Sequence, residues 1–513
     1  MGAWKWGYSP KVEKFIPLGY FSADRYLIIA MRVIENLGWK LSHISATGII
    51  AYTNISLQSY SEEVSIRIDS NFALFKSECI GVQMLFTDYG KNEQNMERFF
   101  NEFDYVEYHL ESIWEQEIDV FEQLKATQDD SYFERAPLVN KDKIKNVLYL
   151  FYPQKGYRVT PVIVLINIFF WLFCVVFLNI AIFLYIRGEL GQQGDVFQLQ
   201  SLYLKLGANS RDLVLKGEWW RLLTQQFMHF SFFHLFFNMY ALIYIGLMVE
   251  PKLGSIKTLV VYILSGVCGG VLSVAMHTTG IMGGASGPIL GMFGALLALM
   301  LCKAFEKNAN KALFISTAIL VAYMLINGAF TRRVDNAAHI GGLISGFVIC
   351  YLLYNERPLR LGMPVVVRYM VSVLLVVLTA GFSILWMPNY QQKEFEKLQG
   401  DFVENSRAFN QVYYIERSFP KAQKLQIIQS SGLDKWKANQ HIVKQMEKLV
   451  LDEKYQLRRR YNSKMAEKGY LLATLMYKQT EAGDKQYQRE ITAIMTEMSE
   501  LGEELRVRLE KID

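Results

Sequence analysis

The chain has 513 residues, of which 51% are apolar and 20% charged, and its formal net charge at pH 7 is only +5. A chain of this length is usually too long to fold around a single hydrophobic core. The uneven spread of apolar residues predicts a membrane body with soluble ends. So small a cationic excess gives no reason to expect nucleic acid as a partner. The five cysteines have no paired spacing, so we expect neither a metal site nor a disulfide framework, and no cofactor.

Residues 1–150 predict a small soluble domain of the α+β class, on the cytoplasmic side. Residues 23–37 have apolar positions at helical spacing and end at Gly38, which suits a helix. The stretches GIIAYTNISL, EVSIRID and NFALFKSECI predict strands of an antiparallel sheet. From Asn92 to about Thr127 the chain is again helix-like. Because this part contains no phosphate loop or catalytic pair, we expect a regulatory or scaffolding module.

Seven apolar runs are long enough, or nearly so, to cross a bilayer core, which needs about 20 helical residues. They lie at roughly 161–186, 232–249, 258–276, 286–302, 312–330, 337–354 and 366–387. Irregular backbone cannot face lipid, so each run is expected to be a helix. The chain is therefore predicted to be a polytopic α-helical membrane protein, with a six-span core at 160–355 and a seventh span at 366–388.

Basic residues cluster in alternate loops, which sets the expected orientation. They are Lys141, Lys143, Lys145, Lys155 and Arg158 before the first span, Lys252 and Lys257 after the second, Lys303, Lys307 and Lys311 after the fourth, and Arg357, Arg360 and Arg368 after the sixth. The positive-inside rule assigns these loops to the cytoplasm, with Arg332 and Arg333 as exceptions on the other side. We expect a multi-pass protein of the cell (plasma or inner) membrane, with its N-terminus cytoplasmic and its C-terminus extracytoplasmic.

The second, fourth and sixth spans enter from the same outer face and carry their polar residues near that end. These residues are His234 and Asn238, then Ser286, then Asn336 and His339. Two GxxxG pairs, Gly287 with Gly291 and Gly342 with Gly346, would let the fourth and sixth helices approach closely. Ser286 and His339, although far apart in the sequence, can then lie side by side at the same depth in the membrane.

Such a pair suits nucleophilic catalysis, in which a neutral imidazole takes the proton as the hydroxyl attacks a carbonyl. Ser286 and His339 are thus the candidate catalytic residues. His234 and Asn238 share one helix face and can donate to the developing oxyanion. The amide of Ser286, at a helix N-terminus, can add a third donor.

Four motifs now coincide: EWWR with Trp220 and Arg221, HLFFN, GASG and AHIGG. Together they resemble the rhomboid intramembrane serine proteases over residues 160 to about 355. Gly284, Gly287 and Gly342 belong to the same motifs. The resemblance implies a dyad without an acidic third member, and a cavity in the lipid bilayer that opens outward. It also implies transmembrane protein substrates, a first loop partly in the outer leaflet, and a fifth span acting as a lateral gate.

Other residues near these motifs receive weaker interpretations. Leu290 stands where members of that family often have an aromatic that stacks on the histidine. Asp335, four residues before His339, is expected to cap the sixth span rather than complete a triad. His229 could line the cavity, although a loop histidine is the simpler interpretation. His277 is given no role.

Residues 389–513 predict a soluble, all-α tail that is rich in Lys, Glu and Gln. Pro420, Gly432 and Gly483 are expected to divide it into several helices, as a hairpin or small bundle. No 34-residue repeat occurs, so tetratricopeptide repeats are not supported. If the tail lies outside, it could hold a partner or filter substrates. A solvated stalk or an oligomerisation arm is the alternative.

Two other functions compete with hydrolysis. One is a catalytically silent, rhomboid-like protein that binds membrane clients, which would be expected to lack Ser286 or His339. The other is a polytopic transporter, which would spread polar residues through the bilayer and carry internal repeats. Both residues are present, and the polar residues gather near one end of the spans, so an intramembrane serine endopeptidase is the favoured prediction.

Overall fold

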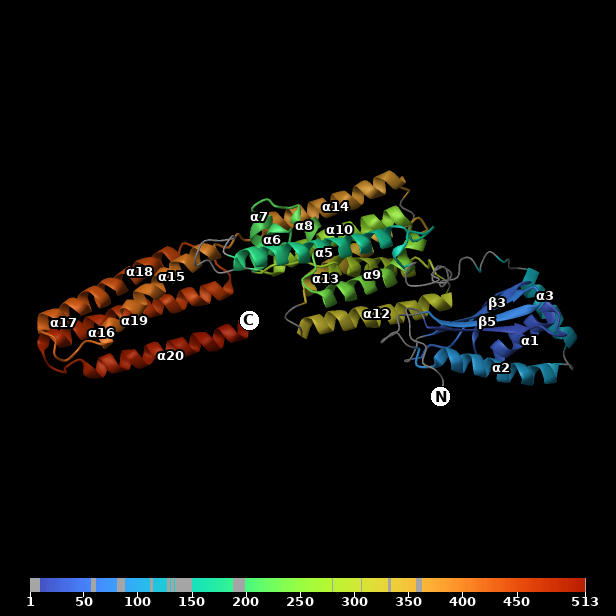
Figure 1. Cartoon of the computed structure of the whole chain (residues 1–513), viewed down its shortest axis with the longest axis horizontal. Coiled ribbons are helices and arrows are strands. Elements are labelled where there is room, and N and C mark those ends of the chain that lie inside the picture. The colour runs from blue at the N-terminus through green and yellow to red at the C-terminus, as the bar shows by residue number, and fades with distance from the viewer. Residues whose placement is uncertain are drawn as a thin grey trace. The chain divides into compact units, whose positions relative to one another are not determined.

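The computed structural model describes residues 10–56, 61–80, 88–110, 114–126, 130, 133, 150–187, 199–278, 280–305, 307–330, 334–356 and 362–512. Seven basic residues used above for orientation lie outside these ranges: Lys141, Lys143, Lys145, Arg332, Arg333, Arg357 and Arg360. The chain is mainly helical, with one small sheet near its N-terminus (Figure 1).

The N-terminal part is a five-stranded antiparallel sheet with helices packed on it. Its elements are β1 (Lys11–Pro17), α1 (Ala23–Asn36), β2 (Lys40–Ser45), β3 (Gly48–Tyr52), β4 (Glu62–Asp69), β5 (Phe72–Cys79), α2 (Lys91–His109) and α3 (Trp114–Ala126). The strand order is β1-β5-β4-β3-β2. The buried face of α1, which includes Leu27 and Met31, packs with Phe75 and Phe99 in one apolar core.

The α+β class predicted for this part is confirmed. However, the prediction missed two strands and treated two helices as one. β1 is a mostly exposed edge strand rich in charge, so it lacks the apolar signal of a buried strand. β2 carries an irregularity between Leu41 and His43, which breaks the two-residue alternation. The single helix expected from Asn92 to Thr127 is two helices, α2 and α3.

Seven apolar helices form the membrane body, as predicted. They are α5 (Val159–Ile186), α9 (Phe232–Leu253), α10 (Ser255–Met276), α11 (Ser286–Leu301), α12 (Lys307–Phe330), α13 (Asn336–Leu353) and α14 (Val365–Trp386). Within the described residues, six are long and apolar enough to cross a membrane, whereas α11 has only 16 residues. Short helices α6 (Leu199–Lys205), α7 (Arg211–Leu215) and α8 (Arg221–Thr224), then the 3-10 turn η5 (Gln225–Phe227), connect α5 to α9.

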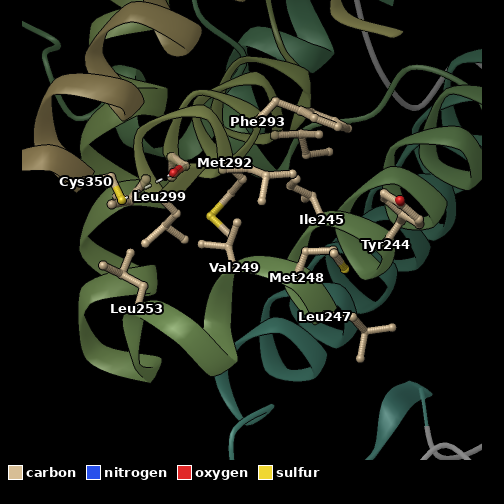
Figure 2. Close-up of a cluster of buried hydrophobic side chains, with 14 of the residues drawn as sticks. Tyr244, Ile245, Leu247, Met248, Val249, Leu253, Met292, Phe293, Leu299 and Cys350 are labelled. Atoms are coloured by element: carbon tan, nitrogen blue, oxygen red, sulfur yellow. Dashed lines mark hydrogen bonds between the residues drawn. The ribbon is translucent and has the colours of Figure 1, made fainter. Parts of the chain in front are cut away.

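The short helix α11 lies at the centre of this body, and most of its side chains are buried. Apolar side chains of α9, among them Ile245, Met248 and Val249, gather with Met292 and Leu299 of α11 (Figure 2). A helix surrounded by protein does not have to match the thickness of the bilayer, because its neighbours rather than lipid cover its ends.

Glycines let α11 and α13 approach until their backbones touch. A Cβ atom built on Gly342 would lie 2.0 Å from the carbonyl oxygen of Gly287, and one on Gly346 would lie 2.1 Å from that of Gly291. Real Cβ atoms do not come this close, so only glycine fits at these two positions. The prediction that the two GxxxG pairs bring the fourth and sixth spans together agrees with this packing.

Residues Trp386–Asp513 form a second compact unit, separate from Met1–Leu385. Its helices are α15 (Gln392–Ala408), α16 (Asn410–Tyr413), α17 (Lys421–Ile427), the π-helical segment η6 (Ile428–Leu433), α18 (Asp434–Met446), α19 (Glu453–Ala482) and α20 (Gln488–Ile512). Pro420 precedes α17 and Gly483 ends α19, as predicted. Gly432 does not interrupt the helix, because α17, η6 and α18 run on without a break; Gly432 packs against Phe409 instead.

Candidate active site

Ser286 is the first residue of α11, immediately after a tightly held loop. Gly284 in this loop has φ +151, in the region that favours glycine. Its amide donates to the carbonyl of Gln225 at 2.9 Å. Met282 and Asn209 exchange two backbone hydrogen bonds of 2.8 and 2.9 Å. The loop before the serine is therefore anchored to the segment between α5 and α9. The amide of Ser286 lies among those at a helix start that have no intrahelical acceptor.

The imidazole of His234 lies beside the serine. The hydroxyl of Ser231 caps α9 by accepting from the amide of His234 at 3.2 Å. A Cβ atom built on Gly284 would lie 3.0 Å from His234 Nε2 and 3.7 Å from Ser286 Oγ. The ring of His234 and the hydroxyl of Ser286 therefore flank the same point, and a side chain at position 284 would force the imidazole to shift by a few tenths of an ångström.

Asn238 follows His234 by one helical turn and is nine-tenths buried. Its side-chain nitrogen Nδ2 has no hydrogen-bond partner within the described part of the chain. A buried amide donor without a partner costs free energy, so its presence calls for an explanation, of which a catalytic role is one.

His339 lies in the first turn of α13 and is 5% exposed. The residue before it, Ala338, contacts the residue after the serine: a Cβ atom on Gly287 would lie 3.5 Å from the carbonyl oxygen of Ala338. The imidazole Nδ1 of His339 is buried, and no described residue bonds to it. No hydrogen bond between the hydroxyl of Ser286 and this imidazole is formed among the described residues.

Asp335 caps α13, as predicted from its position. Its carboxylate accepts from the amide of Ala338 at 2.9 Å and from the hydroxyl of Ser273. His277, to which the sequence assigned no role, has its Nδ1 3.8 Å from the same carboxylate. These contacts hold Asp335 at the start of the helix, and its carboxylate forms no hydrogen bond with Nδ1 of His339.

His229 packs against His234 in an edge-to-face arrangement, with the ring centroids 5.0 Å apart. It is 2% exposed, and its Nδ1 lies 3.2 Å from the carbonyl oxygen of Phe227. Burial, with a smaller contribution from His234, lowers the pKa of His229 to about 3. A neutral His229 whose Nδ1–H donates to that carbonyl fits both facts.

Arg221 anchors the segment that carries the EWWR motif. Although charged, it is 6% exposed. Its guanidinium donates to the carbonyls of Leu204 and Ala208 at 2.6 and 2.7 Å and to the carboxylate of Glu218 at 2.8 Å. It also stacks on Trp220, whose ring is half exposed. The motif therefore organises the loop rather than the reacting groups, which fits a buried arginine with several carbonyl acceptors.

A cavity of about 30 Å³ opens next to the serine. Its lining includes Ser286, Asp335 and two glutamines that sequence reasoning missed, Gln225 and Gln226. Gln226 is 1% exposed, and its Oε1 has no partner among the described residues. The signal for these glutamines was available, because two adjacent amides in an otherwise apolar stretch need buried partners. Within the described residues, no group of His, Cys, Asp and Glu could hold a metal ion.

The model of the rhomboid domain matches residues 216–356 of this chain. Residues 216–356 are therefore identified as a rhomboid domain. Of the curated relatives, RHOMBOID-like protein 5 of Arabidopsis thaliana is 36% identical over 151 residues, 29% of this chain and 48% of the relative. Rhomboid protease GluP of Bacillus subtilis (strain 168) is 35% identical over 193 residues, 36% of each chain. Rhomboid-like protease 2 of Toxoplasma gondii is 36% identical over 143 residues, 28% of this chain and 50% of the relative.

This chain thus spans about a third to a half of the length of these relatives. The matched rhomboid domain runs from the residue after α7 to the residues after α13, so it contains every site residue predicted from the sequence. The N-terminal sheet, α14 and the C-terminal helical unit lie outside it. With its apolar helices, the rhomboid domain makes the chain an integral membrane protein.

Proposed function

We propose that this chain is an intramembrane serine endopeptidase that hydrolyses peptide bonds within or beside transmembrane helices of membrane protein substrates. The proposal rests on one observation above all. Ser286 begins α11, and the helix that bears His339 touches α11 at the next residue, Gly287. The name of the Bacillus subtilis relative, a rhomboid protease, supports the same class of activity.

In the proposed reaction, Ser286 Oγ attacks the carbonyl carbon of the scissile peptide bond while His339 takes the hydroxyl proton. The resulting tetrahedral intermediate collapses, the carbon–nitrogen bond breaks, and His339 returns the proton to the leaving amine. Water then attacks the acyl-serine ester, with His339 again as the base, and releases a carboxylic acid and free Ser286. The cavity beside the serine is large enough to hold a water molecule between its polar side chains.

Three groups would stabilise the oxyanion: the amide of Ser286, the imidazole of His234 and the side-chain amide of Asn238. Two observations support this role. The ring of His234 shares a contact point with the serine hydroxyl, and the Asn238 amide nitrogen is buried without a protein partner. Donors that are already in place act without reorganisation, which makes such groups effective in a site that excludes water.

The dyad is proposed to work without a carboxylate on the imidazole. Asp335 is occupied by the cap of α13 and the hydroxyl of Ser273. With Leu290 four residues after the serine, no aromatic stacks on His339 from that position. The orientation of His339 would then depend on packing at the glycine-lined contact of α11 with α13.

The decisive test compares the purified protein with its Ser286→Ala and His339→Gln variants, in liposomes that contain single-span substrates. We expect cleavage by the parent alone, and labelling of the parent alone by a fluorophosphonate probe. Equal cleavage by the parent and by Ser286→Ala would exclude serine hydrolysis. The silent client-binding alternative predicts a different result: substrates crosslink to the parent and the variants equally, and none is cut.

We further propose that the chain has four parts: a soluble domain at 1–150, the catalytic core at 160–355, a seventh span at 366–388, and a helical tail at 389–513. The N-terminus would be cytoplasmic, and the tail would lie outside, where it could select substrates. Labelling of single introduced cysteines from one side of intact cells tests the orientation. Removing residues 390–513 tests selection, because unchanged cleavage of every membrane substrate would exclude it.

A further inference from the structure

Two cations from different helices share one oxygen atom at an end of the membrane body. Lys257, in the first turn of α10, donates from Nζ to Asn355 Oδ1 at 3.2 Å. Arg368, in the first turn of α14, donates from Nη1 to the same oxygen at 3.1 Å. Its Nε also donates to the carbonyl of Met363 at 2.9 Å, which holds the guanidinium in place. Asn355 itself lies just past the end of α13, so three helices meet at this cluster.

No described residue supplies the anion that this pair lacks. Neither Lys257 nor Arg368 forms an ion pair within the described part of the chain, and the interaction between them is repulsive. Glu356 follows Asn355, but its carboxylate accepts from the hydroxyl of Tyr354 at 3.3 Å. The two half-buried cations repel each other, and the neutral amide oxygen between them does not offset their charge. An anion placed between them would relieve this repulsion.

The unused donors match the oxygens of a phosphate group. Lysine has three N–H donors and arginine has five in a planar fork. One bond from Lys257 and two from Arg368 are accounted for, which leaves donors on both side chains free for one ligand. Arginine binds phosphate through two parallel bonds, and lysine adds a point charge.

We propose that Lys257, Arg368 and Asn355 form a binding site for the phosphate of an anionic phospholipid. The surroundings favour a lipid as the source of the phosphate. Ile256 beside the lysine is 72% exposed, and Val366 near the arginine is 68% exposed. Apolar side chains exposed at the ends of spans are suited to acyl chains, and basic pockets between spans on the cytoplasmic side bind anionic headgroups. Lys257 and Arg368 are among the basic residues whose ends of the spans the positive-inside rule assigns to the cytoplasm, and Asn355 lies at the same end because both cations bond to it.

The site would connect α14 to the rhomboid domain. Lys257 and Asn355 are on or next to helices of the core, whereas Arg368 is on α14, which lies outside the matched residues 216–356. Because α14 is mostly exposed in this structure, with Ser372 and Val376 as its described buried residues, few contacts hold it. A bridging phosphate would add charge-assisted bonds between α14 and the core.

The test measures phospholipid binding by native mass spectrometry of the full chain released from detergent, with phosphatidylglycerol and phosphatidylcholine titrated separately. The double variant Lys257→Gln with Arg368→Gln should bind phosphatidylglycerol roughly 30-fold more weakly, since each cation near an anionic surface contributes about a fivefold factor. Phosphatidylcholine binding should be unchanged. The matched control, Lys303→Gln with Lys311→Gln, makes the same charge change at other basic residues on the same expected side and should bind like the parent.

Folding is checked by the thermal unfolding midpoint in phosphatidylcholine, and Arg368→Lys, which keeps the charge, should recover most of the binding. The proposal is overturned if the double variant binds phosphatidylglycerol as tightly as the parent does, or if the control loses as much. It is also overturned as a lipid site if inorganic phosphate alone raises the unfolding midpoint of the parent as much as phosphatidylglycerol does.

Discussion

Thr160 at the start of α5 and Glu250 near the end of α9 are joined by two hydrogen bonds to one carboxylate oxygen: the hydroxyl donates at 2.7 Å and the amide at 2.9 Å. The other oxygen accepts from the amides of Arg158 and Val159 and from the hydroxyl of Ser255. Glu250 is fully buried. A buried carboxylate that caps the start of another helix satisfies amides that have no intrahelical acceptor.

We expect Glu250→Gln to lower the free energy of unfolding by about 3 kcal/mol, because the substitution removes charge-assisted bonds and places an NH₂ against amide donors. Thr160→Val should lower it by about 1 to 2 kcal/mol, because valine has a similar shape but lacks the hydroxyl that donates to Glu250. Thermal unfolding in detergent measures both. Glu356→Gln, at an exposed carboxylate, is the control, and an equal loss there would contradict the assignment to Glu250.

The contact between α11 and α13 should tolerate no added methyl group. Gly346→Ala would place a Cβ atom 2.1 Å from the carbonyl oxygen of Gly291, so the helices must separate. The expected cost is about 1 to 3 kcal/mol, accompanied by a lower cleavage rate because the helices carry Ser286 and His339. Gly381→Ala in α14 is the control, since no atom lies within 4 Å of the added methyl group. Activity and unfolding midpoints are compared, and similar losses at the two positions would count against close packing.

Gly284→Ala should reduce cleavage through the position of His234. The added methyl group would lie 3.0 Å from the imidazole, at a residue whose φ is +151. Gly280→Ala separates the contact with His234 from the strain of a positive φ. Gly280 also has a positive φ, +94, but nothing lies within 4 Å of a Cβ there. We expect a large fall in kcat for Gly284→Ala and a near-normal kcat for Gly280→Ala. Equally lowered kcat values in the two variants would show that backbone strain alone is responsible, and near-normal values in both would contradict the prediction.

Asn238→Ala should lower kcat by about 100-fold and leave KM nearly unchanged, as expected for a donor used mainly in the transition state. Its unfolding midpoint should not fall, because Nδ2 has no protein partner to lose among the described residues. Asn167→Ala provides a comparison at another buried asparagine, whose Nδ2 donates to the carbonyl of Ile163 at 2.8 Å. That variant should lose stability with kcat retained. The opposite pattern would remove Asn238 from the oxyanion site.

His229 should make folding sensitive to acid. Its pKa is lowered to about 3 in the folded chain, against an ordinary value of 6.5. Between pH 6.5 and 3 the unfolded chain therefore binds a proton at this histidine, whereas the folded chain does not. The free energy of unfolding is thus unaffected by this histidine above pH 6.5 and falls progressively as the pH is lowered towards 3. We expect the unfolding midpoint of His229→Phe to fall less between pH 7 and 4 than that of the parent. His109→Phe, at an exposed histidine, should follow the parent, and identical curves for all three proteins would refute the prediction.

Features that depend on neighbouring residues could be predicted from the sequence. The apolar runs located the membrane helices, and Ser286 begins α11 where the glycines before it allow a tight turn. Asp335 caps α13 because its spacing from the helix start already permits that bond. By contrast, β1 and β2 were missed, since an exposed edge strand and a bulged strand lack the alternation that marks a buried one.

Only the tertiary structure brought together residues that are distant in the chain. No local pattern connects Glu250 with Thr160, or Lys257 with Arg368, since these contacts depend on how whole helices pack. The sequence could mark Gln225 and Gln226 as amides that need buried partners, but only the folded structure placed them in the cavity beside Ser286. Hydropathy and helix caps act within a few residues, so the sequence alone determined the membrane helices and the motifs at their ends. The contacts between helices were decided by close packing across the bundle, which no short stretch encodes.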